Sequence, residues 1–113
     1  MARTRWAPGA AAMAGAARVV EAVVADGRSA DAALAQVEAG DDRSAVRAIA
    51  LGALRWYLRL SPALEALMQR PAGVAPAVRA LLAVGAHQIE YSRNVPEQTV
   101  HAAVDAARIL RSE

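Results

Sequence analysis

A run of apolar residues from Val46 to Leu60 is the feature that most constrains how this chain folds. One set recurs at the spacing of a single helix face, and a second set extends that face around the side. The first set is Val46, Ile49, Ala50, Ala53, Tyr57 and Leu60, and the second is Leu51, Leu54 and Leu58. A helix this apolar belongs in the centre of a bundle, so we expect a central helix from about Arg43 to Leu60. Asp42 is placed to cap its first turn.

Small side chains dominate the rest of the apolar content, which favours closely packed helices. Hydrophobic residues make up 56% of the 113 residues, yet there are only two Trp, two Tyr and no Phe. Alanine has the highest helix propensity, and small side chains let helices approach closely. No stretch alternates between apolar and polar residues as a half-buried strand would. We therefore predict one all-α domain, because a second domain in a chain this short would have too little core.

Capping signals bound two helices before the central one. The first spans about 10–25 and ends at Gly27, where a left-handed conformation costs glycine nothing. The second runs from the N-cap Ser29 to about Glu38, and Gly40 ends it.

Proline signals bound three helices after the central one, which makes six in total. Ser61 and Pro62 mark the start of the fourth, to about Gln69, and Pro76 opens the fifth. The sixth runs from about Pro96 to Arg111. The predicted inner stripes are Ala12, Ala16, Val19, Val20 and Val23 in the first helix; Ala30, Ala33, Leu34 and Val37 in the second; Val78, Leu81, Leu82, Gly85 and Ile89 in the fifth; and Val100, Ala103, Val104, Ala107 and Leu110 in the sixth. Gly85 is expected to permit a close helix crossing.

Residues suited to catalysis, metal binding or nucleotide binding are scarce. There is no cysteine, and His87 and His101 fall outside the predicted inner stripes, which favours solvated surface positions over metal or catalytic roles. No Gly-rich phosphate loop such as GxGxxG occurs. We expect a chain that is not an enzyme by itself and that holds no cofactor or metal.

No part of the sequence indicates a membrane partner. No uncharged apolar run reaches the ~18 residues that a membrane span needs. The alanine-rich start continues into the charged residues Arg18 and Glu21, unlike a signal peptide. We expect a cytoplasmic protein.

All thirteen basic residues are arginine, whose planar guanidinium recognises phosphate in a bidentate manner. A GC-rich genome explains the same bias, and a net charge of +2 is too small to establish a nucleic-acid partner. Helical spacing places Arg43 and Arg47 one turn apart, and likewise Arg55 and Arg59. These four are candidate phosphate contacts, although surface arginines also solvate helices or pair with acidic residues.

Four short motifs carry a resemblance to a known family. They are Gly-Ala-Leu-Arg-Trp-Tyr at 52–57, Arg70-Pro71, Val-Gly-Ala-His-Gln-Ile-Glu-Tyr at 84–91 and Asn94-Val95-Pro96. In this order they resemble the NusB-like domain at the N-terminus of bacterial small-subunit rRNA (cytosine-5) methyltransferases of the RsmB/Sun type. The resemblance covers about residues 17–110 and implies a NusB-like bundle of about seven helices. It also implies that the basic N-terminal segment and first helix face RNA, and Arg3, Arg5 and Arg18 occupy those positions here.

Two departures from the family pattern lead us to expect a fragment or a truncated product of a longer enzyme. The family's C-terminal helix, which normally follows the position of Leu110, is absent. The catalytic methyltransferase domain, with its cysteine nucleophile and S-adenosylmethionine site, is absent as well. We expect a flexible basic arm at residues 1–9 and a truncated NusB-like RNA-binding domain at 10–113. Dimerisation or a swapped helix would relieve the incomplete packing.

Three functions follow as alternatives. The first is a non-catalytic accessory domain that binds small-subunit rRNA for a cytosine-5 methyltransferase. The second is a NusB-like transcription antitermination factor that binds RNA together with a protein, and the third is a helical module for protein interaction or homodimerisation. For RNA binding, the candidate residues are Arg3, Arg5, Arg18, Arg43, Arg47, Arg55 and Arg59.

Overall fold

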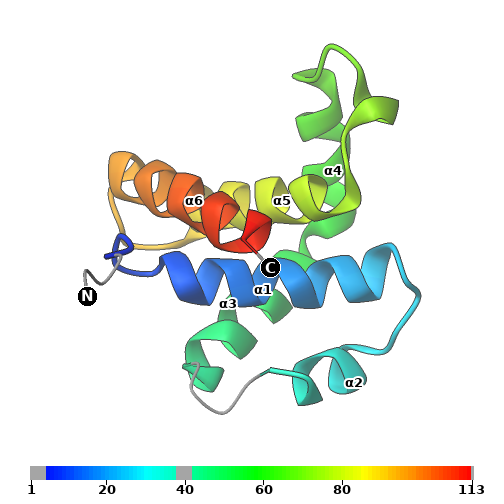
Figure 1. Ribbon diagram of the computed structural model, residues 1–113. Helices are drawn as coiled ribbons and strands as arrows, with labels where there is room; N and C mark the ends of the chain where they lie inside the picture. The colour runs from blue at the N-terminus through cyan, green and yellow to red at the C-terminus, as the bar shows by residue number, and fades with distance from the viewer. Residues whose placement is uncertain (1–4, 38–41, 113) are drawn as a thin grey trace.

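The computed structural model describes residues 5–37 and 42–112, and within these ranges every regular element is a helix. The elements are α1 (Ala10–Val24), α2 (Ala30–Ala35), α3 (Arg43–Arg55), α4 (Tyr57–Ala66), a 3₁₀ turn η1 (Pro71–Gly73), α5 (Pro76–Tyr91) and α6 (Pro96–Arg111). α5 and α6 form a hairpin on one side of α1, and α3 lies on another side (Figure 1). The prediction of an all-α domain with six helices is confirmed.

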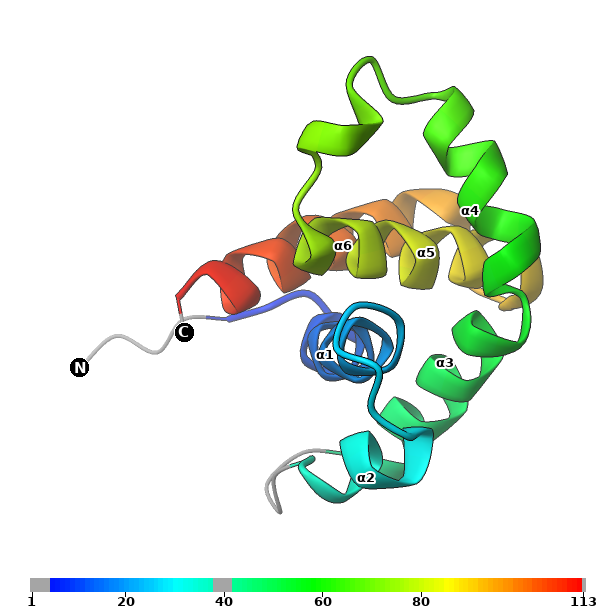
Figure 2. The same ribbon diagram turned by 90° about the vertical axis from the view of Figure 1, so that its right-hand side faces the viewer.

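α1 is the centre of the fold. Figure 2 views it end-on, with α2, α3, α5 and α6 around it, and all four contact it. Its buried residues are Ala10, Met13, Ala14, Gly15, Ala16, Ala17, Val19 and Val20. α3 buries only Val46, Ala50 and Ala53, so the expectation that the helix beginning at Arg43 is the central one is wrong. Small side chains on several sides of α1 let several neighbours approach it closely.

Local capping signals produce the helix boundaries around α2 and α3. The Ser29 hydroxyl accepts a hydrogen bond from the Ala32 amide at 3.0 Å, and the Asp42 carboxylate accepts one from the Ala45 amide at 3.1 Å. Gly27 has a φ of 70°, the left-handed conformation expected after α1. Gly40 and Glu38, the predicted end of the second helix, lie outside the described residues.

The boundary between the third and fourth helices lies at Trp56, and the prediction of a boundary at Ser61 and Pro62 is wrong. Trp56 leaves the helical region with φ −104° and ψ 6°, while Pro62 lies inside α4. The bend lets the Trp56 ring stack on Tyr91 of α5 at a centroid separation of 5.3 Å. α4 tolerates Pro62 on its exposed side, at the loss of the amide hydrogen bond that proline cannot donate.

α4 projects from the bundle and buries none of its residues (Figure 1). Leu58 is 88% exposed, and Leu67, which follows the helix, is 85% exposed. An ion pair between Glu65 and Arg79 of α5, at 2.7 Å, links the far end of α4 to the bundle. Arg79 also donates a hydrogen bond to the Pro71 carbonyl.

The inner faces of α5 and α6 differ from the predicted stripes. Five residues predicted to face inward are exposed, namely Val78, Leu82, Ile89, Val100 and Val104. The buried residues are instead Ala80, Leu81, Ala83, Val84 and Gly85 in α5, and Thr99, Ala102, Asp105 and Ala106 in α6. Because α1 presents mostly alanine, its neighbours approach closely through their own small residues. The sequence prediction favoured the larger apolar side chains, so the predicted inner faces of α5 and α6 are rotated about the helix axes relative to the observed ones.

Two glycines allow close side-chain contacts between helices. A Cβ at Gly15 would lie 3.0 Å from Val46 Cγ2, and a Cβ at Gly52 would lie 2.4 Å from His87 Cε1. At Gly85 the nearest atom, Met13 Cε, would be 4.0 Å away, which is an ordinary contact. The expectation that Gly85 permits a close crossing is therefore wrong, and Gly52 has that role against α5.

We predict opposite effects for two glycine-to-alanine substitutions. Gly85→Ala should stabilise the protein by about 0.5–1 kcal/mol, because alanine favours the helix and has room. Gly52→Ala should destabilise it by roughly 1 kcal/mol net, because overpacking against His87 exceeds the gain in helix propensity. Urea unfolding followed by circular dichroism measures both. In a His87→Ala background the penalty of Gly52→Ala should vanish, and a persistent penalty would contradict the proposed clash.

Candidate nucleic-acid interface

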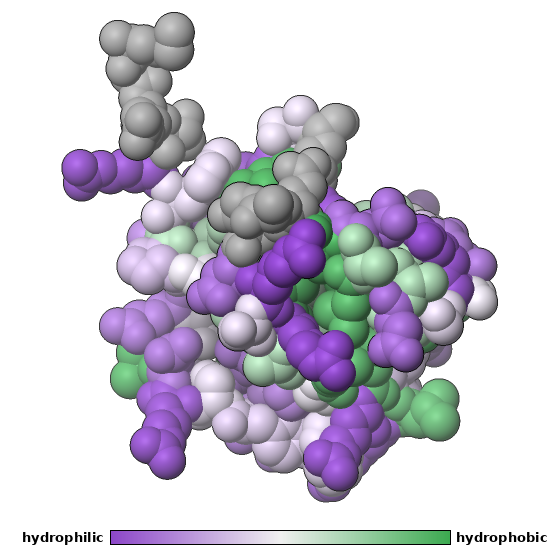
Figure 3. Space-filling view, turned by 90° about the horizontal axis from the view of Figure 1, so that it is seen from below, coloured by the Kyte–Doolittle hydropathy of each residue, from purple (hydrophilic) through white to green (hydrophobic). Residues whose placement is uncertain are grey.

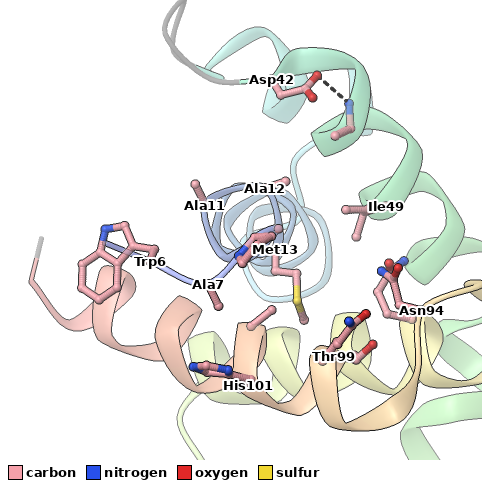
Figure 4. Close-up of a pocket in the computed structure, with 16 residues that line it drawn as sticks. Trp6, Ala7, Ala11, Ala12, Met13, Asp42, Ile49, Asn94, Thr99 and His101 are labelled. Atoms are coloured by element: carbon pink, nitrogen blue, oxygen red, sulfur yellow. Dashed lines mark hydrogen bonds between the residues drawn. The ribbon is translucent and has the colours of Figure 1, made fainter. Parts of the chain in front are cut away.

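A groove of about 720 Å³ opens where the N-terminal segment meets the starts of α1 and α3 and the hairpin of α5 and α6 (Figure 4). We call it the N-terminal groove. Its lining residues are Trp6, Ala7, Pro8, Gly9, Ala11, Ala12, Met13, Asp42, Ala45, Ile49, Gln88, Asn94, Gln98, Thr99, His101 and Ala102. Its volume falls in the range typical of small-molecule sites.

Polar groups with both donor and acceptor capacity line the groove on the α5 and α6 side. Gln88, Asn94 and Gln98 carry carboxamides, which donate and accept hydrogen bonds. Thr99 is only 4% exposed, and its Oγ1 has no hydrogen-bond partner within the described part of the chain. A buried hydroxyl without a partner costs about 1–3 kcal/mol, so Thr99 lowers the stability of the fold, and its buried Oγ1 is closed to a ligand.

Trp6 lies at the edge of the groove, on the segment that precedes α1 (Figure 4). Its side chain is 38% exposed, and the neighbouring Arg5 is exposed. Exposed aromatic rings stack on unpaired bases, and arginines contact the phosphates between them. Trp6 can stack on a planar ring, and the carboxamides can hydrogen-bond to polar groups at its edge. A nucleobase has both features.

Asp105 of α6 fixes the position of this segment. Its carboxylate accepts the Ala7 amide at 2.7 Å and an Arg108 guanidinium N–H at 2.9 Å, and His101 Nε2 lies 4.0 Å away. The hydrogen bond from Ala7, with help from Arg108 and His101, holds the pKa of the Asp105 carboxyl below its usual value against the opposing effect of burial. Gly9, with a φ of 87°, then turns the chain into α1. The end of the predicted flexible arm is thus anchored, while Arg3 lies outside the described residues.

We predict that Asp105→Asn releases the N-terminal segment. The neutral carboxamide oxygen of this variant would be a weaker acceptor for Ala7, so the Ala7 amide should exchange its proton faster and the melting temperature should fall. Because the pKa of Asp105 is lowered on folding, wild-type stability should decline as the pH falls through that pKa, and the variant should lose this part of the acid dependence. Glu97→Gln, which changes an exposed carboxylate on the same helix, is the control. Unchanged Ala7 exchange in Asp105→Asn would contradict the anchoring role.

Arg43 and Arg47, both predicted RNA contacts, lie together. They line a hollow of about 270 Å³ between α2 and α3, with Leu34 and Val37 as apolar neighbours and Asp31 as the acidic one. Arg43 also donates a hydrogen bond to the Val37 carbonyl at 2.8 Å. Seen from below, this side of the molecule has hydrophobic surface bordered by hydrophilic residues (Figure 3).

The other predicted arginines lie elsewhere. Arg55 ends α3 and Arg59 lies in α4, so their expected arrangement one turn apart on a single helix is wrong. The bend at Trp56 separates them, although both are exposed. Arg18 is half-buried in α1, and Arg5 is exposed beside Trp6. The predicted arginines that the structure describes are therefore divided among the N-terminal segment, α1, the hollow between α2 and α3, and the bend between α3 and α4.

The two histidines have different environments. His101 is exposed, as predicted, with 72% of its side chain accessible. The prediction of a solvated position for His87 is wrong, because its ring is half-buried against Gly52 and lies 5.0 Å from the Tyr91 ring centroid. Burial lowers the pKa of His87. Within residues 5–37 and 42–112, no group of three His, Asp or Glu side chains is placed to hold a metal ion.

We predict that His87 makes stability depend on pH. Since burial lowers the pKa of His87, the unfolded chain binds its proton at a higher pH than the folded chain. The contribution of His87 to the free energy of unfolding should be fully present above about pH 6.5 and should be lost as the pH falls through the lowered pKa of the folded state. Urea unfolding above and below that pH should show a smaller decline for His87→Gln than for wild type. Equal declines in wild type and His87→Gln would contradict the prediction.

The fold is that of a small helical domain with a groove beside its N-terminal segment. Residues 12–113 match the NusB family, and the chain belongs to that family. No curated protein and no solved structure matches the chain. Among the described helices, none is both long and apolar enough to cross a bilayer.

Two polar residues of α6, one lining the groove and one anchoring the N-terminal segment, were not among the sequence predictions. Thr99 and Asp105 lie on the small-residue face of α6, beside Ala102 and Ala106. The sequence did contain a signal for them, namely a polar residue on a helix face made mostly of alanine. Such a residue is surrounded by backbone and needs a hydrogen-bond partner. The contact between Asp105 and Ala7 joins residues 98 positions apart, and no local pattern predicts it.

Proposed function

We propose that this chain is an RNA-binding accessory domain that positions small-subunit rRNA for a cytosine-5 methyltransferase and is not catalytic by itself. The observation that carries the proposal is the N-terminal groove. It combines the exposed Trp6 with three carboxamides, and Arg5 precedes Trp6 in the sequence. Membership of the NusB family supports RNA as the partner.

The methyltransferase part of the proposal rests on sequence motifs. Gly-Ala-Leu-Arg-Trp-Tyr at 52–57 contains the bend at Trp56, and residues 84–91 supply both His87 and Tyr91. These two motifs, which resemble the RsmB/Sun type, thus meet in space where Gly52 contacts His87 and Trp56 stacks on Tyr91. The two motifs that carry the resemblance therefore pack against each other in the fold.

We predict that the domain binds RNA in a salt-dependent manner through the N-terminal groove. Fluorescence anisotropy with a small-subunit rRNA hairpin and a scrambled hairpin measures affinity at several salt concentrations. Each phosphate contact should contribute about 0.7–0.9 to the slope of log affinity against log salt. Trp6→Ala should weaken binding by about 1–3 kcal/mol if one base stacks there.

Matched variants separate the groove from general surface charge. Gln98→Ala should weaken binding, whereas Gln36→Ala, which changes an exposed glutamine next to α2, should not. Arg5→Ala should reduce the salt slope more than Arg28→Ala. Thr99→Val should raise the melting temperature and leave RNA binding unchanged, because it removes a buried hydroxyl that lacks a partner and is closed to a ligand. Failure of both hairpins to bind at low salt would refute the proposed function.

A second candidate function is an antitermination-type factor that binds RNA jointly with a protein. The observation that favours it is the exposed apolar surface of the α5–α6 hairpin, which includes Val78, Leu82, Ile89, Val100 and Val104. Exposed apolar residues that recur along one side of a helix, as Val78 and Leu82 or Val100 and Val104 do, are typical of protein-interaction surfaces. Equal affinity for the specific and scrambled hairpins, in the absence of any protein partner, would favour this candidate over the first.

A further inference from the structure

Two aromatic rings stack on the surface at the start of α4, apart from the N-terminal groove. Trp56 and Tyr91 are nearly parallel, with an interplanar angle of 17° and centroids 5.3 Å apart. Tyr91 is 43% exposed, at the end of α5, and Trp56 is half-buried. Figure 2 shows the start of α4 beside the end of α5. We call the two rings the aromatic pair.

One arginine without an acidic partner lies over the aromatic pair, and two more lie next to the pair in sequence. Arg59 lies with its guanidinium carbon 5.8 Å from the Trp56 ring centroid. Arg55 directly precedes Trp56, and Arg93 follows Tyr91 by two residues. All three arginines are exposed, and none of the three forms an ion pair with a described residue.

The contact between Arg59 and Trp56 is loose. A cation–π contact extends to about 6 Å from the ring centroid, so 5.8 Å is close to its limit. An exposed guanidinium held this weakly can turn toward a phosphate at little cost. The Trp56 and Tyr91 rings, in contrast, are fixed by each other and by His87, which lies against Tyr91 and Gly52.

We propose that the aromatic pair is a second RNA-contact site, which stacks one unpaired nucleobase while Arg59 and its neighbours contact the flanking phosphates. The inference rests on the proposed RNA-binding function and assigns it a separate site. Base–aromatic stacking tolerates any base, so this site adds affinity for single-stranded RNA without reading its sequence. Three arginines without ion-pair partners favour a polyanion over a protein surface, whose apolar groups would leave those charges uncompensated.

The fluorescence of Trp56 provides a direct test. The chain has two Trp residues, so Trp6→Phe leaves Trp56 as the single tryptophan and keeps an aromatic ring in the N-terminal groove. A fluorescein-labelled single-stranded RNA of mixed sequence is titrated for anisotropy, and the unlabelled RNA is titrated for Trp56 emission. We expect RNA to quench Trp56 and Arg59→Ala to weaken binding several-fold, whereas Arg28→Ala, which removes another exposed arginine, has a smaller effect.

A second variant and a second RNA keep the test independent of folding. Tyr91→Leu removes half of the pair and should weaken binding by about tenfold, with its melting curve checking the fold. RNA with abasic sites throughout should bind without quenching Trp56. RNA binding with unchanged Trp56 emission, and equal effects of Arg59→Ala and Arg28→Ala, would overturn this site and leave the proposed function standing. Absence of RNA binding by anisotropy at low salt would overturn both.

Discussion

Close packing of small side chains around α1 is the constraint on which the other elements depend. α1 contacts α2, α3, α5 and α6, and alanine and glycine make up most of its buried residues. Because dispersion and burial grow with close approach, α5 and α6 pack through faces rich in small residues, to which α5 adds Leu81 and Val84. The same packing leaves larger apolar residues, such as Leu82 and Val100, on the outside of the hairpin.

Anchoring of the N-terminal segment follows from that arrangement. α6 lies close enough to the start of α1 for the buried Asp105 to reach the Ala7 amide. The carboxylate would be costly in this position without its hydrogen bonds from Ala7 and Arg108. Those bonds in turn place Trp6 at the edge of the groove that Thr99 lines. One charged group in the α6 interface therefore links helix packing to the geometry of the candidate binding site.

Local chemistry made much of the fold predictable from sequence. Ser29 and Asp42 cap α2 and α3 as expected, because a cap depends on residues three positions apart. The errors concern interactions distant in sequence. Trp56 breaks the helix where it meets Tyr91, although Ser61 and Pro62 carry the stronger local signal. Of the candidate site, the sequence indicated Arg5, which precedes the groove residue Trp6, while the groove itself depends on how α1, α3, α5 and α6 meet.

The sparse burial of α4 has a consequence for the motions of the domain. Because α4 contributes no buried residue, its opening exposes little new apolar surface and costs much less than unfolding of the bundle. Its amides should exchange with solvent through local opening, on a faster timescale than those of α1. Two contacts hold the ends of α4, namely the ion pair between Glu65 and Arg79 and the aromatic contact at Trp56. The segment between them can therefore open transiently while the remaining helices stay packed.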